Sequence, residues 1–117
     1  MNAASLQGKK VRDEFEKNLC TLVFMARAYG IHLIVATQYP TATYVTSALK
    51  SNLPFRVAFR LPSHTDSMTI LDRTGAEDLL GNGDMLMLSD EGLARLQGCF
   101  ISEDEIIEFV NNNFSES

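Results

Sequence analysis

Gln38 is the residue whose position most clearly suggests a chemical role. It stands in GIHLIVATQYP, residues 30–40, where a short apolar run ends on Ala36-Thr37-Gln38 ahead of Pro40. In open α/β sheets, ligands bind beyond the C-terminal ends of the strands. A glutamine at such an end can orient a water molecule or contact a phosphate oxygen without adding charge. The alternative is that its amide only fixes the loop before Pro40, and the pattern alone favours this structural role.

No other pattern in the chain specifies a reaction. The sequence has no nucleophile elbow, no metal-binding His-Glu helix and no G-x-x-x-x-G-K-[ST] phosphate loop. GNGD, residues 81–84, has two glycines but lacks the lysine and precedes a strand, so it predicts a turn. His64 has no partner in the pattern and is predicted to be a surface helix residue. Cys20 and Cys99 are isolated, which favours small buried hydrophobes over a disulfide or a metal site.

Charge is distributed unevenly along the 117 residues. The net charge of -5 argues against a free-standing nucleic-acid-binding protein. Residues 1–60 carry eight Lys/Arg against three Asp/Glu, and residues 61–117 carry two against twelve. This favours either two solvated faces of opposite sign, or a basic half that faces an anion or the acidic patch of a neighbouring copy. No apolar window approaches the length of a membrane span, so a cytoplasmic protein without membrane contact from this segment is expected.

The apolar pattern predicts an α/β domain. In chain order it predicts a helix over 9–29, a strand over 32–35, a helix over 44–51, a strand over 55–61, a helix over 63–72, a turn over 75–84, strands over 85–88 and 93–101, and a last helix from 102. Such alternation predicts a mainly parallel sheet flanked by helices, with the last two strands antiparallel. The first strand is expected to be buried on both faces.

Several residues predict where these helices begin and end. Gly30 is a natural end for the first helix, and Thr41 or Thr43 is a candidate N-cap of the second. Ser63 has the Ser-x-x-Asp spacing of an N-cap, and SEDE at 102–105 is a capping box. The tail at 115–117 is expected to be disordered.

Two long stretches resemble one known family. ARAYGIHLIVATQYP and ALKSNLPFRVAFRLPSHTDSMTILDRTGAEDLLGNGDMLML closely resemble the motor domain of FtsK/SpoIIIE-type DNA translocases, in register over residues 8–110 or so. The resemblance implies the C-terminal part of a RecA-like P-loop ATPase core. Such motors form homo-hexameric rings and move double-stranded DNA through the centre of the ring during chromosome segregation and cell division. Full-length relatives are often anchored to the membrane through an N-terminal region that is absent here.

The resemblance also implies that the nucleotide-holding parts are missing from residues 1–117. The family's Walker A loop and Walker B strand precede the region matched here, and neither is present in the sequence. ATP and Mg²⁺ are therefore expected in the complete motor, and neither is expected to bind this chain alone. By matching position, Gln38 is the family's sensor glutamine and Arg27, in ARAYG, is the arginine finger presented to the neighbouring subunit. Arg56, in PFRVAF, is the fallback for that finger, and the helix-dipole cap is the structural alternative for Arg27.

Three positions depart from the family pattern. Family cations near the DNA-contacting loops are replaced by Tyr39, His64 and Met68, so these are nucleic-acid-binding residues by position only. The departures leave two alternatives to a DNA motor open. One is a fragment of a secretion or conjugation ATPase that moves protein, and the other is a non-enzymatic interaction remnant.

The isolated 117-residue chain is expected to bind ATP negligibly, because no lysine-bearing phosphate loop is present to hold the β- and γ-phosphates. Isothermal titration calorimetry with Mg-ATP checks this. A micromolar dissociation constant would contradict it.

Overall fold

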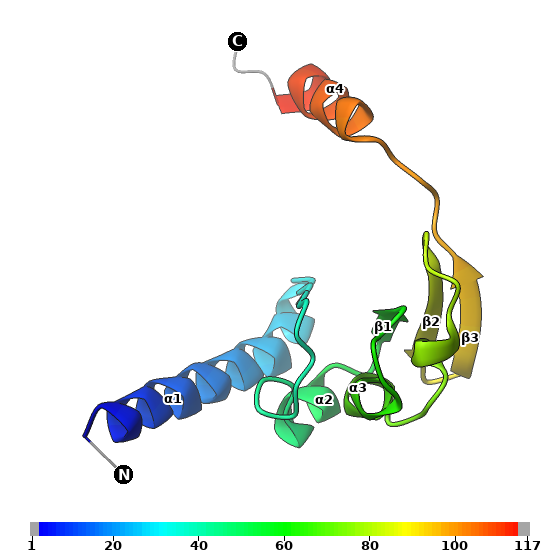
Figure 1. The fold of residues 1–117 in the computed structure, drawn as a ribbon. Helices are drawn as coiled ribbons and strands as arrows, with labels where there is room; N and C mark the ends of the chain where they lie inside the picture. The colour runs from blue at the N-terminus through cyan, green and yellow to red at the C-terminus, as the bar shows by residue number, and fades with distance from the viewer. Residues whose placement is uncertain (1–2, 115–117) are drawn as a thin grey trace.

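The computed structural model describes residues 3–114, with side chains from Ser5 onward (Figure 1). A long helix, α1, spans Ala3–Ala26 and continues as a 3-10 turn, η1, at Arg27–Tyr29. The later elements are α2 (Ser47–Asn52), β1 (Arg56–Phe59), α3 (His64–Leu71), η2 (Ala76–Asp78), β2 (Asp84–Ser89), β3 (Gly92–Gln97) and α4 (Glu103–Phe114). The predicted disordered tail at 115–117 lies outside the described residues.

The strands form one three-stranded sheet in the order β1-β2-β3, and both strand pairs are antiparallel. The antiparallel pairing predicted for the last two strands is confirmed. The mainly parallel sheet is not confirmed, because no parallel pair exists among residues 3–114. β3 also ends at Gln97, short of the predicted 101.

The strand predicted at 32–35 is wrong for this structure. Residues 31–37 are extended but pair with no strand, and Ile34 is 91% exposed. Burial on both faces was expected, yet of residues 32–35 only Leu33 is even half-buried. The physical reason is that an extended segment becomes a buried strand only when neighbouring strands supply its hydrogen bonds and helices cover its faces.

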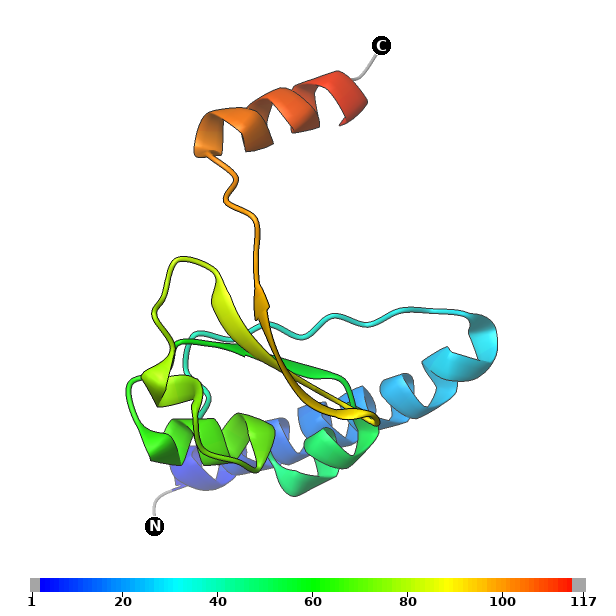
Figure 2. The same ribbon diagram turned by 90° about the vertical axis from the view of Figure 1, so that its right-hand side faces the viewer.

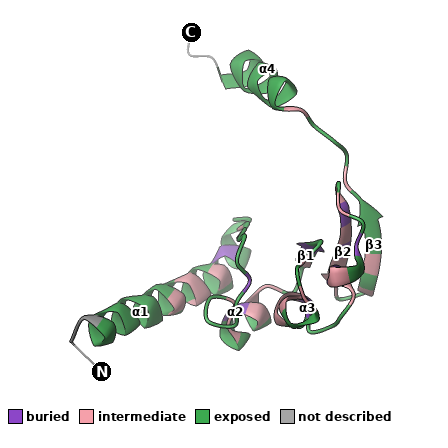
Figure 3. Ribbon diagram, viewed as in Figure 1, coloured by how far each residue is buried: buried purple, intermediate pink, exposed green. Residues whose placement is uncertain are grey.

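The hydrophobic core lies on one face of the sheet. Ala58 and Leu86 of the sheet pack against Leu71 of α3 and against Ala76 and Leu79 at η2. Ser67 is fully buried beside them and ties this layer together, because its hydroxyl donates to the Arg73 carbonyl (2.7 Å) and accepts from the Ala76 amide (3.1 Å). The core therefore holds α3 and η2 against only one side of the strands, and the burial pattern follows this arrangement (Figure 3).

The helix ends follow the predicted signals at three of four places. Gly30 is left-handed (φ 68°) and its amide donates to the Arg27 carbonyl. Ser63 caps α3 by accepting from the Asp66 amide, and Ser102 and Glu105 form the reciprocal capping box of α4. The N-cap of α2 was predicted wrongly. The side chain of Thr46, and not that of Thr41 or Thr43, accepts a hydrogen bond from the Leu49 amide. Thr41 instead accepts two amides with its carbonyl in the preceding turn.

The predicted GNGD turn is confirmed. Gly81, Asn82 and Gly83 all have positive φ (85°, 53° and 91°). Glycine adopts such values without strain, and asparagine does so more often than most other residues. The turn joins η2 to β2 and brings Gly83 against Gly98, whose amide donates to the Gly83 carbonyl at 2.7 Å.

The two cysteines are free. Cys20 is half-buried on α1 and Cys99 is exposed, so the prediction of a buried hydrophobe does not hold for Cys99. Cys99 lies in the extended residues 98–102, which carry α4 away from the sheet (Figure 2). No helix within residues 3–114 is both long and apolar enough to cross a bilayer.

Asp84 is a buried carboxylate at the start of β2. It accepts two hydrogen bonds from Arg95 (Nε, 2.9 Å; Nη2, 2.6 Å) and one from the Leu80 amide (2.7 Å). These donors, the arginine first, lower the pKa of Asp84 to about 2. Because the charged form is favoured in the folded state, the contribution of Asp84 to stability is present above pH 3.8 and is lost as the pH falls through about 2.

We expect Asp84→Asn to be less stable than the parent chain at neutral pH, and the difference between the two to shrink as the pH falls from about 4 to about 2. Urea denaturation at a series of pH values measures it. Asp90→Asn, in the β2–β3 turn, is the control and is expected to show no such dependence. A stability difference for Asp84→Asn that stays constant across this range would contradict the assignment.

Candidate functional site

Gln38 lies at the end of the unpaired extended segment, on the surface. Within residues 31–38 the one main-chain hydrogen bond made by a backbone amide runs from Ile31 to the Ala26 carbonyl (3.0 Å). The turn after Gln38 is held locally, since the Tyr39 amide donates to the Thr37 hydroxyl at 3.1 Å. The side-chain amide of Gln38 makes no hydrogen bond to the described residues. It does not tie down the loop before Pro40, which is the structural role that the pattern alone favoured.

The extended segment lies along α1 and forms one wall of an apolar groove. The opposite wall is α1, and the loop that leads into α2 closes one side. Arg12 stands over the ring of Tyr44 at this place, 6.0 Å from its centroid. The residues that line the groove are Arg12, Phe15, Glu16, Leu19, Leu33, Ile34, Val35, Ala36, Thr37, Thr43, Tyr44, Val45 and Leu49.

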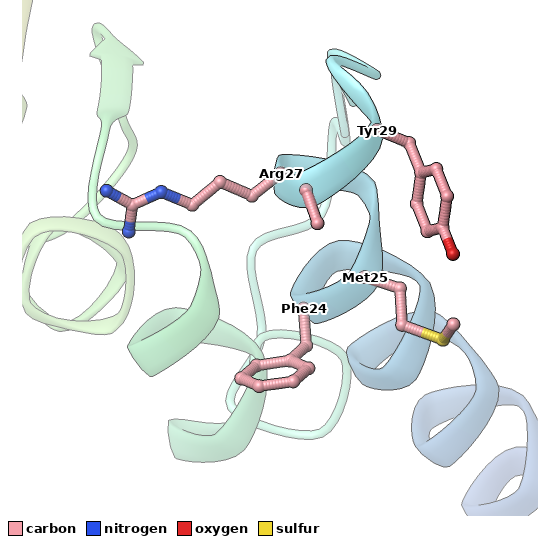
Figure 4. A pocket seen from close by; sticks show the side chains of 5 residues that line it. Phe24, Met25, Arg27 and Tyr29 are labelled. Carbon is pink, nitrogen blue, oxygen red and sulfur yellow. The ribbon is translucent and has the colours of Figure 1, made fainter.

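Arg27 lies one turn before the extended segment, in η1. Its guanidinium is exposed and makes no hydrogen bond or ion pair with the described residues. Figure 4 shows its side chain pointing away from Met25 and Tyr29, with which it lines a shallow hollow at the end of α1. The guanidinium is therefore available to a group outside residues 3–114.

Arg56 is engaged within the chain. Its Nη1 donates to the Ile70 carbonyl (2.8 Å) and to Asp72 Oδ2 (2.7 Å), and its buried Nε has no partner among the described residues. Lys50 Nζ binds the other carboxylate oxygen of Asp72 at 2.5 Å. Lys50 first, and then Arg56, lower the pKa of Asp72. Arg56 therefore joins β1 to the end of α3, and this arrangement favours Arg27 over Arg56 as the outward-facing arginine.

Two side-chain contacts that join α2 to its neighbouring helices were not predicted from the sequence. The Thr46 hydroxyl donates to Glu16 Oε1 of α1 while it caps α2, so that α1 and α2 are joined by a side-chain contact. At the other end of α2, Lys50 is bound to Asp72 of the α3 end. No local spacing signals either pair, because their partners lie 30 and 22 residues apart in the sequence.

The three positions with lost cations are all exposed. Tyr39 follows Gln38 in the loop and is 75% exposed. His64 begins α3, and Met68 follows one turn later on the same side of that helix. Within residues 3–114 no group of three or more His, Cys, Asp or Glu side chains could hold a metal ion.

The similar proteins are all named DNA translocases. The DNA translocase FtsK of Caldanaerobacter subterraneus subsp. tengcongensis is 47% identical over 107 residues, 87% of this chain. The DNA translocase SpoIIIE of Bacillus subtilis is 48% identical over 101 residues, and FtsK of Staphylococcus aureus is 46% identical over 106 residues. This chain spans only 13–15% of the length of these relatives. No protein-family profile matches the chain.

A solved structure supports the same relationship. The pCW3 conjugation coupling protein TcpA, in its monomer form with ATPγS, superposes with a TM-score of 0.68 and 30% identity. The superposition covers 74% of this chain and 25% of TcpA. Together with the identities of 46–48% to the translocases, it establishes that the chain belongs to the FtsK/SpoIIIE family of DNA translocases and corresponds to a C-terminal part of them.

Proposed function

We propose that this chain is part of an ATP-driven motor that moves double-stranded DNA, in chromosome segregation and cell division. The observation that carries the proposal is the extended segment 31–37, which lacks strand partners and still delivers Gln38 to an exposed position. In a chain 46–48% identical to DNA translocases, this arrangement fits the sensor end of a strand in a larger RecA-like sheet. The strands beside it, and the phosphate loop, belong to another part of the motor.

The nucleotide would be held mainly by that other part. ATP needs a phosphate cradle and a carboxylate-bound Mg²⁺, and residues 3–114 offer neither a lysine-bearing loop nor a metal-binding cluster. What this chain can contribute is a neutral amide at Gln38 that orients the attacking water. Its side chain makes no hydrogen bond within the described residues, so it is available for that contact.

Arg27 would act across a subunit boundary. A guanidinium that stabilises charge on the γ-phosphate must reach a nucleotide outside its own fold. Arg27 is exposed and has no carboxylate partner among residues 3–114, whereas Arg56 is bound to Asp72. We therefore assign the finger to Arg27 in an assembled ring of six subunits, with DNA passing near Tyr39, His64 and Met68.

A second candidate is a conjugation-type ATPase. It is favoured by the structural likeness to a conjugation coupling protein and by the absence of cations at those three positions. Loss of phosphate contacts lowers DNA affinity and its salt dependence. A motor that binds DNA with an unusually small dependence on salt concentration would support this candidate.

Gln38 is best tested in a chimaera in which this chain replaces the matched segment of Bacillus subtilis SpoIIIE, with which it shares 48% identity. We expect the chimaera to hydrolyse ATP when DNA is present. Gln38→Ala should lower turnover by about 10²- to 10³-fold with little change in nucleotide affinity, because positioning of water acts mainly in the transition state. Thr43→Ala, in the same loop, is the control, and near-normal turnover by the Gln38 variant would leave Gln38 without this role.

Arg27 is tested by mixing subunits of the same chimaera. Arg27→Ala should abolish turnover in the ring, since arginine fingers contribute about 10³- to 10⁵-fold, and Arg27→Lys should rescue poorly because an ammonium lacks the planar fork. Arg27→Ala subunits with an intact phosphate loop should regain partial activity beside subunits that carry Arg27 and a defective loop. Arg73→Ala is the matched control on an exposed arginine. Mixed rings that stay inactive at every ratio, although both parents assemble, would show that Arg27 does not act in trans.

A further inference from the structure

The chain bends at Gln38, where the segment 31–37 ends. Immediately before the bend, the Thr37 hydroxyl accepts a hydrogen bond from the Tyr39 amide at 3.1 Å. A threonine hydroxyl that accepts from the amide two residues later closes a local turn in place of a backbone carbonyl. The bond therefore spans Gln38 and joins the residues on its two sides.

The backbone after the bend is fixed by other contacts. Pro40 is buried, its ring locks φ, and it restricts the residue before it to extended conformations. The Tyr39 carbonyl accepts from the Thr41 amide at 2.8 Å. The carbonyl of Thr41 in turn accepts from the amides of Tyr44 and Val45, both at 2.9 Å. The loop that leads to α2 is thus held by hydrogen bonds back as far as Tyr39.

The backbone before the bend has no comparable support from the described part of the chain. From residue 32 to residue 38, no backbone amide donates to another main-chain group of residues 3–114. The Thr37 hydroxyl therefore ties the end of this segment to the fixed loop. Loss of the hydroxyl would release the bend at Gln38 and would leave the hydrogen bonds of the loop itself in place.

The direction of the Gln38 side chain depends on this backbone. Its side-chain amide has no hydrogen-bonding partner within residues 3–114, so no polar contact there orients it. A group that positions a water molecule must be held close to the productive geometry, because a displacement of about 1 Å can lower the rate by about 100-fold. Gln38 therefore needs a fixed backbone at the bend, and the Thr37 hydroxyl is placed to provide it.

We propose that Thr37 is a positioning residue, whose hydroxyl holds the Tyr39 amide and so sets the direction in which Gln38 meets the attacking water. The inference rests on the proposed function of Gln38 in ATP hydrolysis. In this role Thr37 touches neither the nucleotide nor the water, and its whole effect on the reaction passes through Gln38.

The test uses the SpoIIIE chimaera described above. Thr37→Val keeps the branched shape and removes the hydroxyl, so kcat should fall by about 3- to 10-fold, the size expected for one hydrogen bond, with little change in KM for ATP. Thr37→Ser keeps the hydroxyl and should retain near-parental turnover. Thr41→Val is the matched control in the same loop. It keeps the carbonyl that makes the turn and removes a hydroxyl without a hydrogen bond to the described residues, so turnover should not change.

A double-mutant cycle separates positioning of Gln38 from support of the fold. If Thr37 acts through Gln38, Thr37→Val should cost nothing further in a Gln38→Ala background, whereas the losses from two independent residues multiply. Parental turnover by Thr37→Val would overturn the inference. So would a loss that Thr37→Ser shares, or losses that multiply in the double variant.

The same measurements distinguish failure of this inference from failure of the proposed function. When Gln38→Ala lowers turnover, the contrary results above remove only the role of Thr37. Near-normal turnover by Gln38→Ala removes the role of Gln38 and that of Thr37 with it. If the Thr37→Val chimaera does not assemble, Thr37→Ala takes its place. Failure of both to assemble would show that the residue supports the fold, and would also overturn the inference.

Discussion

The requirement that an extended backbone find hydrogen-bonding partners governs this structure. β2 satisfies it on both sides through antiparallel ladders with β1 and β3, and β1 and β3 each satisfy it on the side that faces β2. Residues 31–37 have an apolar composition suited to a strand, but they pair with no strand. The sheet β1–β3, with α3 and η2, therefore has a hydrophobic core of its own. The segment that ends at Gln38 has strand-like residues but no paired strand.

Local signals in the sequence predicted local structure well. Gly30, Ser63 and the Ser102–Glu105 box act within four residues of themselves, so their effects were visible in the sequence and are confirmed. The α2 cap was misplaced because three threonines stand close together and only the packing against α1 selects Thr46. The parallel sheet was not found because the strand-like pattern at 32–35 describes side chains and not the partners of the backbone.

The candidate site was predictable in position more than in partners. Gln38 and Arg27 were located by resemblance, and the structure adds that both are exposed and lack side-chain partners within residues 3–114. The contact between Arg56 and Asp72 could not be predicted from a local pattern, since the two residues are 16 positions apart. The charge distribution is explained only in part by two solvated faces. Lys50 and Arg56 of the basic half are paired with Asp72 of the acidic half inside one chain.

Side-chain contacts hold α2 at both of its ends. Glu16 of α1 holds the residue that caps α2, and Lys50 near the other end of α2 holds the residue that ends α3. The α1 helix, which leads to Arg27, packs against α2, and α2 is bound through Lys50 to the end of α3, so α2 links α1 to the body of the domain (Figure 1). Exposed ion pairs contribute little to stability, typically below about 1 kcal/mol, and the Asp72 carboxylate is 55% exposed. The effect of these contacts is on orientation, because the Thr46–Glu16 and Lys50–Asp72 contacts set where α2 lies between α1 and the end of α3.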